Sequence, residues 1–264
     1  MTLALDQRQR AMLAEIGLRG FAAVPLPAVA QEPAAPPVAI RAPRPAVAEP
    51  TIARSTPVPA APAIAPQPVV RLPAGPVAQM DWEALAQAVA GCRACGLCER
   101  RHTTVFGVGD LQPDWLVVGE APGEQEDLQG EPFVGQAGKL LDNMLRALGV
   151  DRRRKVYIAN VLKCRPPGNR NPEPAEVAQC EPFLRRQVEL LRPKIILALG
   201  RFAVQSLLGS TEPIGRLRGR VHQYQGVPLV VTYHPAYLLR NLPEKAKAWA
   251  DLCLALEQLR AQAG

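Results

Sequence analysis

Four short apolar runs lie between residues 114 and 232, and each ends abruptly in glycine or polar residues. In the first, the run Leu116 to Val118 precedes a turn at 119–123 that holds two glycines and a proline. Unbroken apolar runs are typical of parallel strands that are buried on both faces, and a turn of this composition cannot continue a strand. The other three strands are predicted at 156–162, 194–199 and 227–232.

Segments with helical periodicity separate these runs. Apolar residues recur at helical spacing, and prolines or capping residues mark the starts, in five segments: 81–91, 138–148, 174–191, 202–208 and 244–262. The basic, glycine-containing segment 215–224 is predicted to form a two-stranded flap. Because strands and helices alternate, the fold class is α/β, with a mostly parallel sheet that is covered on both faces.

Polar residues gather after the first, second and fourth strands. The carboxyl ends of parallel strands meet at one edge of a sheet, so we expect Glu120, Phe133, Asn160 and His234 to line one pocket. An aromatic ring beside backbone amides and a carboxylate suits a flat polar ring such as a nucleobase. The alternative is an ordinary strand-to-helix turn with a solvated acidic face.

The composition changes before residue 81. Residues 24–80 hold 15 of the 28 prolines and only six charged residues. Such a chain favours extended polyproline-like conformations, so this segment is predicted to be a disordered linker. It separates an N-terminal segment, 1–23, with a short amphipathic helix at 5–20, from a folded domain at 81–264. Recruitment of an unidentified protein partner by the N-terminal tail is a further hypothesis.

The net charge of +7 favours an anionic partner, with nucleic acid first. The N-terminus lacks the pattern of a secretory signal, and no apolar run reaches the roughly 18 residues of a membrane span. We therefore expect a cytoplasmic protein that does not bind membranes. Thiols stay reduced in that compartment, so the six cysteines are expected to be metal ligands or core residues rather than disulfides.

Five of these cysteines gather in two segments: Cys92, Cys95 and Cys98 in the first, and Cys164 and Cys180 in the second. Four soft ligands from two segments fit an iron–sulfur cluster or a tetrahedral zinc ion. By spacing alone, Cys98 is either a fourth ligand in place of Cys180 or an idle thiol. Cys253 lies between two leucines of a predicted helix and is expected to be a core residue.

Four motifs follow the C-x2-C pair in a fixed order: GEAPGEQED (119–127), PFVG (132–135), NVLKCRPPGNR (160–170) and HPAYLLR (234–240). Together they resemble the family 4 (iron–sulfur) uracil-DNA glycosylases, over about residues 86–262. The resemblance implies a three-layer α/β/α sandwich around a four-stranded, mostly parallel sheet. It also implies an enzyme that flips uracil out of DNA and hydrolyses its N-glycosidic bond, leaving an abasic site for base excision repair.

The resemblance also implies a set of site residues. The [4Fe–4S] cluster would be held by Cys92, Cys95, Cys164 and Cys180, with Cys98 as a bystander. The uracil pocket would be formed by Glu120, Ala121, Glu126, Phe133, Asn160 and His234.

Each of these side chains suits a part of the reaction. Phe133 would stack on the base, and the Asn160 amide would match O4 and N3–H of uracil. Glu126 would crowd out the methyl group of thymine, and His234 would donate to O2 as the bond breaks. Ala121 stands where related branches carry a water-activating Asp, so Glu120 is our candidate for that role. The loop 167–172 has no histidine, so no covalent adduct with DNA is expected.

DNA must be held while the base is out of the stack. Leu238 and Leu239 are candidates for a wedge that fills the vacated stack. Candidate phosphate-binding residues are Arg165, Arg170, Arg216, Arg218, Arg220 and Arg240. The basic run 152–155 precedes the second strand and is expected to be a solvated surface on the far edge.

Two other functions are compatible with the chain. One is a non-catalytic, glycosylase-like DNA-binding module associated with a polymerase or repair complex. The other is a zinc-dependent nucleic-acid-binding protein. We expect a monomer that acts on uracil-containing DNA, single- or double-stranded.

Overall fold

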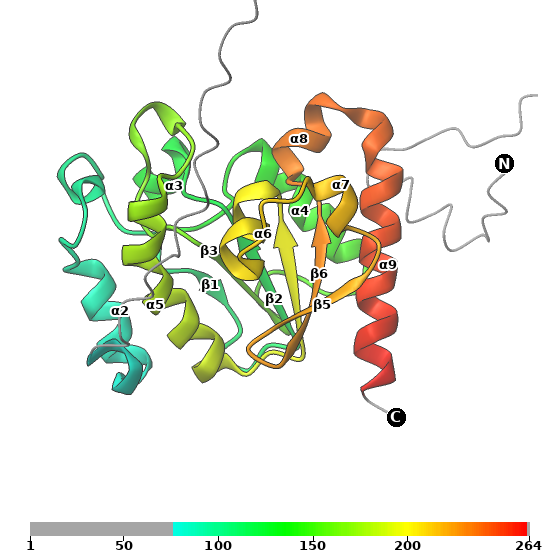
Figure 1. Ribbon diagram of the computed structural model, residues 1–264, viewed down its shortest axis with the longest axis horizontal. Helices are drawn as coiled ribbons and strands as arrows, with labels where there is room; N and C mark the ends of the chain where they lie inside the picture. The colour runs from blue at the N-terminus through cyan, green and yellow to red at the C-terminus, as the bar shows by residue number, and fades with distance from the viewer. Residues whose placement is uncertain (1–75, 263–264) are drawn as a thin grey trace, which may run out of the picture. The chain divides into compact units, whose positions relative to one another are not determined.

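The structure is a computed structural model, and it describes residues 76–262 (Figure 1). The predicted helix at 5–20 and the predicted linker up to residue 75 lie outside the described residues. The end of that linker is corrected, because Pro76–Gln79 forms a 3-10 helix, η1. Val77 and Met80 pack on the folded body, and Arg186 Nε donates a hydrogen bond to Met80 O at 2.8 Å.

A six-stranded sheet forms the centre of this body, with strand order β1-β3-β2-β4-β6-β5. Its strands are β1 (Val108–Gly109), β2 (Trp115–Gly119), β3 (Val156–Asn160), β4 (Ile195–Leu199), β5 (Val221–Tyr224) and β6 (Val227–Thr232). The four central strands are parallel, as predicted. The bounds of each strand differ from those of the predicted apolar run by at most two residues.

The predicted strand number of four is corrected by the two antiparallel edge strands, β1 and β5. β1 has only two residues, which is too few to show a pattern. β5 alternates exposed and half-buried residues, as expected of an edge strand. It joins β6 through Gln225 and Gly226, whose φ angles of 50° and 79° are those of a tight hairpin turn. The predicted flap is therefore a short helix followed by an edge strand of the main sheet.

Helices cover both faces of the sheet (Figure 1). The α-helices are α2 (Trp82–Ala90), α3 (Glu124–Gln129), α4 (Gln136–Ala147), α5 (Pro174–Leu191), α6 (Arg201–Leu208), α7 (Ile214–Leu217), α8 (Pro235–Arg240) and α9 (Lys245–Ala261). Three further 3-10 helices are η2 (Gly96–Glu99), η3 (Pro167–Asn169) and η4 (Leu242–Glu244). The five predicted helices are confirmed, with bounds that shift by at most two residues.

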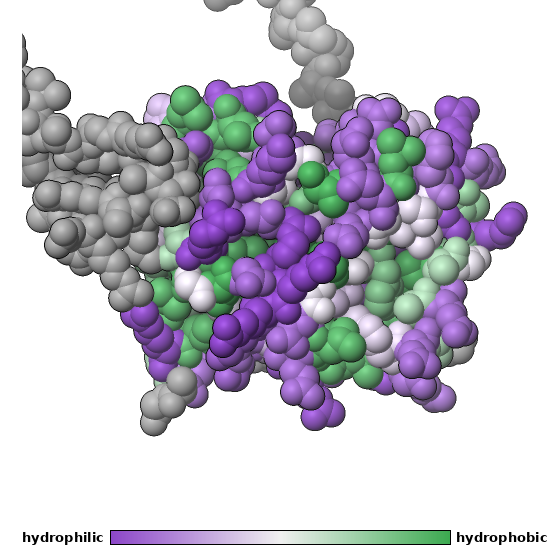
Figure 2. Space-filling view, turned by 180° about the vertical axis from the view of Figure 1, so that it is seen from behind, coloured by the Kyte–Doolittle hydropathy of each residue, from purple (hydrophilic) through white to green (hydrophobic). Residues whose placement is uncertain are grey.

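Alternating strand residues divide the core into two layers, because successive side chains of a strand point to opposite faces. Val117 and Ile158 pack with α4, α8 and α9, whereas Leu116 and Ala159 pack with α5 and α6. The class is thus α/β with helices on both faces. A third cluster joins α2 to α5 around Leu85 and Leu162, and it contains Cys164 and Cys180. Seen from behind, hydrophilic side chains cover much of this body, with hydrophobic areas between them (Figure 2).

Candidate active site

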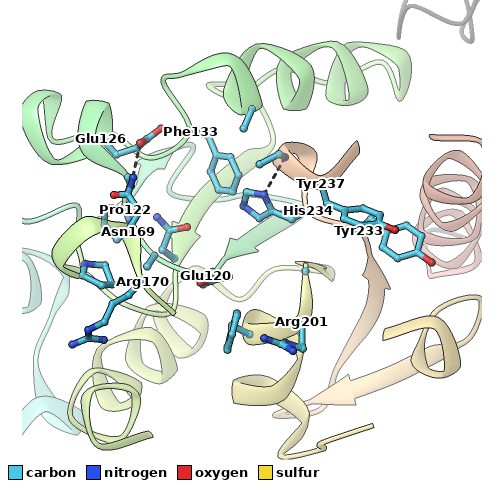
Figure 3. Close-up of a pocket in the computed structure, with 18 of the residues that line it drawn as sticks. Glu120, Pro122, Glu126, Phe133, Asn169, Arg170, Arg201, Tyr233, His234 and Tyr237 are labelled. Carbon is cyan, nitrogen blue, oxygen red and sulfur yellow. Dashed lines mark hydrogen bonds between the residues drawn. The ribbon is translucent and has the colours of Figure 1, made fainter. Parts of the chain in front are cut away.

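A cavity of about 830 Å³ opens at the carboxyl ends of the parallel strands (Figure 3). β2 is followed in the chain by β3 on one side and, later, by β4 on the other, so the strand order reverses beside β2. Ligands bind in the crevice at such a reversal. The structure brings all six predicted pocket residues to this cavity: Glu120, Ala121, Glu126, Phe133, Asn160 and His234.

Asn160 is the last residue of β3, and its side chain is buried. Its Oδ1 has no hydrogen-bond partner within residues 76–262. A buried polar atom without a partner is costly, so this oxygen is poised for a donor that the bound molecule brings. Asn160 lies beside Gly119 in the parallel register of β2 and β3.

His234 is the N-cap residue of helix α8, and its Nδ1 accepts a hydrogen bond from the backbone N–H of Ala236 at 3.1 Å (Figure 3). Nδ1 therefore carries no proton, and the proton of the neutral ring is on Nε2. Burial, aided by the positive charge of Arg240, lowers the pKa of His234 to about 4. At neutral pH the ring is an uncharged donor through Nε2–H.

Glu120 directly follows β2 and is half-buried in the same cavity. Burial raises the pKa of its carboxyl group to about 7, and the positive charge of Arg201 opposes that rise. A carboxyl group with a pKa near the working pH can both accept and release a proton.

The Glu126 carboxylate binds the backbone of the loop that carries Phe133. Its Oε2 accepts a hydrogen bond from Gly123 N at 3.1 Å, and its Oε1 accepts one from Val134 N at 3.0 Å. Glu126 therefore ties the start of α3 to the residue after Phe133. The Phe133 ring is buried and lies across from His234, with ring centroids 5.4 Å apart.

Five cysteines line a second, small cavity between α2 and α5: Cys92, Cys95, Cys98, Cys164 and Cys180. The two predicted segments therefore meet, and Cys98 faces the same cavity as the other four. Arg101 Nη1 donates to Cys164 Sγ at 3.2 Å, and Lys163 N donates to Cys180 Sγ at 3.5 Å. Cys253 packs on the opposite face of the sheet with α9, as expected of a core residue.

No group of three His, Cys, Asp or Glu side chains in the described part of the chain is arranged to hold a single metal ion. Hydrogen bonds from N–H groups to the sulfurs, as at Cys164 and Cys180, are typical of thiolates that bind a cluster. The donor set therefore fits an iron–sulfur cluster.

Two of the predicted DNA-binding residues are corrected. Leu238 is 1% exposed and belongs to the core beneath α8, which leaves Leu239, 41% exposed, as the candidate for the wedge. Arg218 pairs with the buried carboxylate of Asp251 at 2.8 Å and lies over the Tyr233 ring. Its charge is used within the fold, where it offsets that of Asp251.

The other candidate arginines differ in whether their side chains are paired and exposed. Arg170 and Arg240 line the main cavity, although Arg170 is also paired with Glu176. Arg165 donates to Asn169 Oδ1 at 2.8 Å and is largely covered. Arg216 and Arg220 stay candidates, and Arg220 lies 4.0 Å from Glu212. The expectation that Arg152 is solvated is wrong, because its side chain is 17% exposed and bonds to the Phe133 loop.

The sequence analysis missed several residues that line the main cavity. They are Asn169, Arg201, Phe202, Tyr233 and Tyr237. Arg201 lies two residues after the end of the third parallel strand, so the rule that located the other pocket residues would also have found it. The Arg201 guanidinium lies 4.4 Å from the centroid of the Phe202 ring.

Comparisons with known proteins agree with this geometry. The family model described as "Uracil DNA glycosylase superfamily" matches residues 106–253. The chain is 45% identical to a type-4 uracil-DNA glycosylase of Archaeoglobus fulgidus, over 59% of this chain and 81% of that protein. It is 46% identical to one of Thermotoga maritima, over 60% of this chain and 83% of that protein. A third, of Pyrobaculum aerophilum, is 40% identical over 66% of this chain and 93% of its own length.

An α/β sheet with a pocket at the carboxyl ends of its parallel strands, together with these matches, defines a protein of the DNA glycosylase class. The chain belongs to the uracil-DNA glycosylase superfamily, and within it to the type-4 uracil-DNA glycosylases. None of the helices within residues 76–262 is long and apolar enough to cross a membrane.

Proposed function

We propose that this protein removes uracil from DNA by hydrolysing the N-glycosidic bond, which leaves an abasic site and initiates base excision repair. The observation that carries the proposal is that two polar side chains, those of Asn160 and His234, line the same cavity. The unpaired Oδ1 of Asn160 and the neutral His234 both face the space where a flipped base would lie. The type-4 uracil-DNA glycosylases to which the chain is similar support the same activity.

Recognition of uracil follows from the chemistry of these groups. The flipped ring stacks on Phe133, and Asn160 accepts from N3–H with Oδ1 while its amide N–H donates to O4. Cytosine presents the reversed donor and acceptor pattern at these positions, so it leaves both groups unpaired and is rejected. The Glu126 segment forms the wall beside C5 and leaves no room for the methyl group of thymine.

Bond cleavage leaves negative charge on the uracil ring, much of it on O2. The Nε2–H of His234 donates to that oxygen, and a preformed donor of this kind contributes on the order of 10²–10³ in rate. Because His234 is already neutral, the donor costs no proton uptake at neutral pH. Glu120, in its ionised form, accepts a proton from the attacking water.

The DNA backbone is held at the rim of the cavity by Arg170 and Arg240, and Leu239 enters the space that the flipped base leaves. The protein acts as a monomer in the cytoplasm in this proposal. A non-catalytic DNA-binding module is the alternative, and the intact pocket favours the enzyme.

A [4Fe–4S] cluster completes the domain in this proposal, held by Cys92, Cys95, Cys164 and Cys180. The cluster would supply a structural crosslink when bound. It would join the segment after α2 to the segment after β3 and to α5, and β3 ends at Asn160. The residues around it cover the thiolates: Arg101 lies against Cys164, and the backbone of Lys163 lies against Cys180.

The test is strand scission after alkali of a labelled oligonucleotide that contains one uracil. We expect cleavage by the wild type and a loss of about 10²-fold or more in His234→Ala and in Asn160→Ala. His222→Ala and Asn143→Ala change the same residue types outside the cavity and should cleave like the wild type. Oligonucleotides with thymine or cytosine at the same position should stay intact.

Failure of the cluster-loaded wild type to cleave, with DNA binding retained, would overturn the enzymatic proposal in favour of the binding module. A colourless protein that contains zinc in place of iron would support the zinc-dependent alternative.

A further inference from the structure

Phe133 has a backbone conformation that a bulky residue rarely adopts. Its φ angle is 56°, in the left-handed region, although the residue is neither glycine nor asparagine. Such a conformation persists only where the surroundings impose it, and it is concentrated at functional sites. The chain therefore needs contacts that hold this residue in place.

One side of the loop is held by Arg152, which lies between α4 and β3. Its Nη2 donates to Phe133 O at 2.7 Å, and its Nη1 donates to Pro132 O at 3.1 Å. The Nε of the same guanidinium donates to Asp142 on α4 at 2.8 Å. The flat fork of an arginine reaches two successive carbonyls and a carboxylate from three separate nitrogens, whereas the donors of a lysine all leave one nitrogen.

The same carbonyl is packed against α4. A Cβ atom added at Gly138 would lie 1.7 Å from Phe133 O, so the loop backbone touches the helix directly. The N–H groups after Phe133 are bound by Glu126. Arg152 thus binds the C=O of the peptide group between Phe133 and Val134, and Glu126 binds the N–H of that same group and of the next one.

The orientation of the ring follows from this backbone. The Phe133 ring is 5% exposed, and its plane lies 27° from that of His234. The carbonyls of Pro132 and Phe133 belong to the two peptide groups that flank the Phe133 Cα, so binding both holds φ and ψ of Phe133 and with them the direction of its Cα–Cβ bond. The face on which the base stacks is therefore set by a residue that lies outside the cavity.

We propose that Arg152 is a positioning residue that orients the Phe133 ring for the flipped base by binding the carbonyls of Pro132 and Phe133. The inference rests on the proposed function, since the ring must receive the base. It assigns the first residue of a basic run to the active site. The next residue, Arg153, has a side chain that is 75% exposed and lies 3.9 Å from Glu131, so it provides a matched control.

The experiment measures single-turnover excision from a single-stranded oligonucleotide over a range of enzyme concentrations. For Arg152→Ala we expect the maximal rate to fall by about tenfold or more, because small misplacements in an active site cost this much. The half-saturating concentration should change by less than about twofold, because the phosphate contacts remain. Arg152→Lys keeps the charge but not the fork, and it should also be slow. Arg153→Ala should match the wild type.

A role in stability alone would not give this result. If Arg152 acts through the ring, its effect should shrink to less than about twofold in a Phe133→Leu background, since coupled residues are not additive. Equal effects in both backgrounds, or a wild-type maximal rate in Arg152→Ala, would overturn the inference. If Arg152→Ala does not fold, a wild-type rate in Arg152→Lys would overturn it. Inactivity of the wild type would instead overturn the proposed function.

Discussion

Gly119 and Asn160 lie side by side at the ends of β2 and β3, so close that a side chain at Gly119 has no space. A Cβ atom there would lie 2.4 Å from Asn160 Oδ1 and 2.6 Å from Phe133 Cζ. The absence of a side chain at Gly119 therefore makes room for both the hydrogen-bonding group and the stacking ring of the pocket.

Gly119→Ala should displace both groups and lower uracil excision by about 10²-fold, because sub-ångström placement controls the rate. The measurement is excision under single turnover. Gly215→Ala is the control, because its added Cβ has no atom within 4 Å and Gly215, like Gly119, has no positive φ. An unchanged excision rate in Gly119→Ala would contradict the assigned arrangement of the pocket.

The pH dependence of excision should report Glu120. Its pKa is raised to about 7, and the base form is the ionised one that predominates above that pH. The rate should therefore fall by about tenfold for each pH unit below 7 and level off above it. His234 adds no step between pH 5 and 9, because its pKa is lowered to about 4 and the neutral ring persists throughout.

Glu120→Gln should remove the acid limb and lower the rate at pH 8 by about 10²–10⁴-fold. Glu124→Gln changes an exposed carboxylate at the start of α3, four residues after Glu120, so it is the matched control and should keep the wild-type profile. A wild-type profile that is flat from pH 5 to 8 would show that another group activates the water.

Cysteine substitutions should separate ligands from bystanders. Cys164→Ser should lose most of the bound iron and its visible absorbance, because a hydroxyl is a poor substitute for a thiolate. Cys253→Ser, on the other face of the sheet, should retain both. Iron and sulfide content per chain are the measurements. Cys98→Ser should also retain the cluster, and a loss of iron there would identify Cys98 as a ligand.

The two neighbouring leucines of α8 should behave differently. Leu238→Ala opens a cavity in the core and should lower the free energy of unfolding by about 2–5 kcal/mol. Leu239→Ala removes an exposed side chain and should change it by less than about 0.5 kcal/mol. Its excision from duplex DNA should slow more than its excision from single strands, because only the duplex has to be opened. Equal slowing on both substrates would exclude the wedge.

The arginines should also divide into two kinds. Arg218→Ala leaves the buried Asp251 carboxylate unpaired and should cost about 3–5 kcal/mol of stability, with DNA affinity of the folded protein unchanged. Arg240→Ala should leave the free energy of unfolding unchanged and weaken DNA binding. The slope of the logarithm of the binding constant against the logarithm of the salt concentration should fall by about one, as for the loss of one phosphate contact. Denaturant titration and binding at several salt concentrations measure the two effects. A salt slope that changes in Arg218→Ala would reassign it to the DNA contact.

Much of the fold could be predicted because its signals are local. Each central parallel strand coincides with an apolar run to within two residues at either end, and Pro174 marks the first turn of α5 at the predicted residue. The edge strands escaped prediction because β1 is too short and β5 carries a polar, alternating pattern. Glu120, Asn160 and His234 could be predicted as pocket residues because each lies at or within two residues of the end of a strand, and these strand ends meet at one edge.

What escaped prediction depends on partners that are distant in sequence. Leu238 and Leu239 are adjacent and chemically identical, and only the packing of α8 on the core buries the first and exposes the second. Arg218 and Arg152 look like surface charges in the sequence. Their roles come from Asp251, which is 33 residues away from Arg218, and from Phe133, which is 19 residues away from Arg152.

The sequence by itself determined the class of the fold, the edge of the sheet that carries the pocket, and the residues that follow its strands. Periodicity and strand ends are properties of short segments, so they can be read without knowing how the segments pack. Only the tertiary structure decided which charges are free, which thiols share a cavity, and how the Phe133 ring is held. These depend on distances between side chains from different segments, and those distances exist only once the chain has folded.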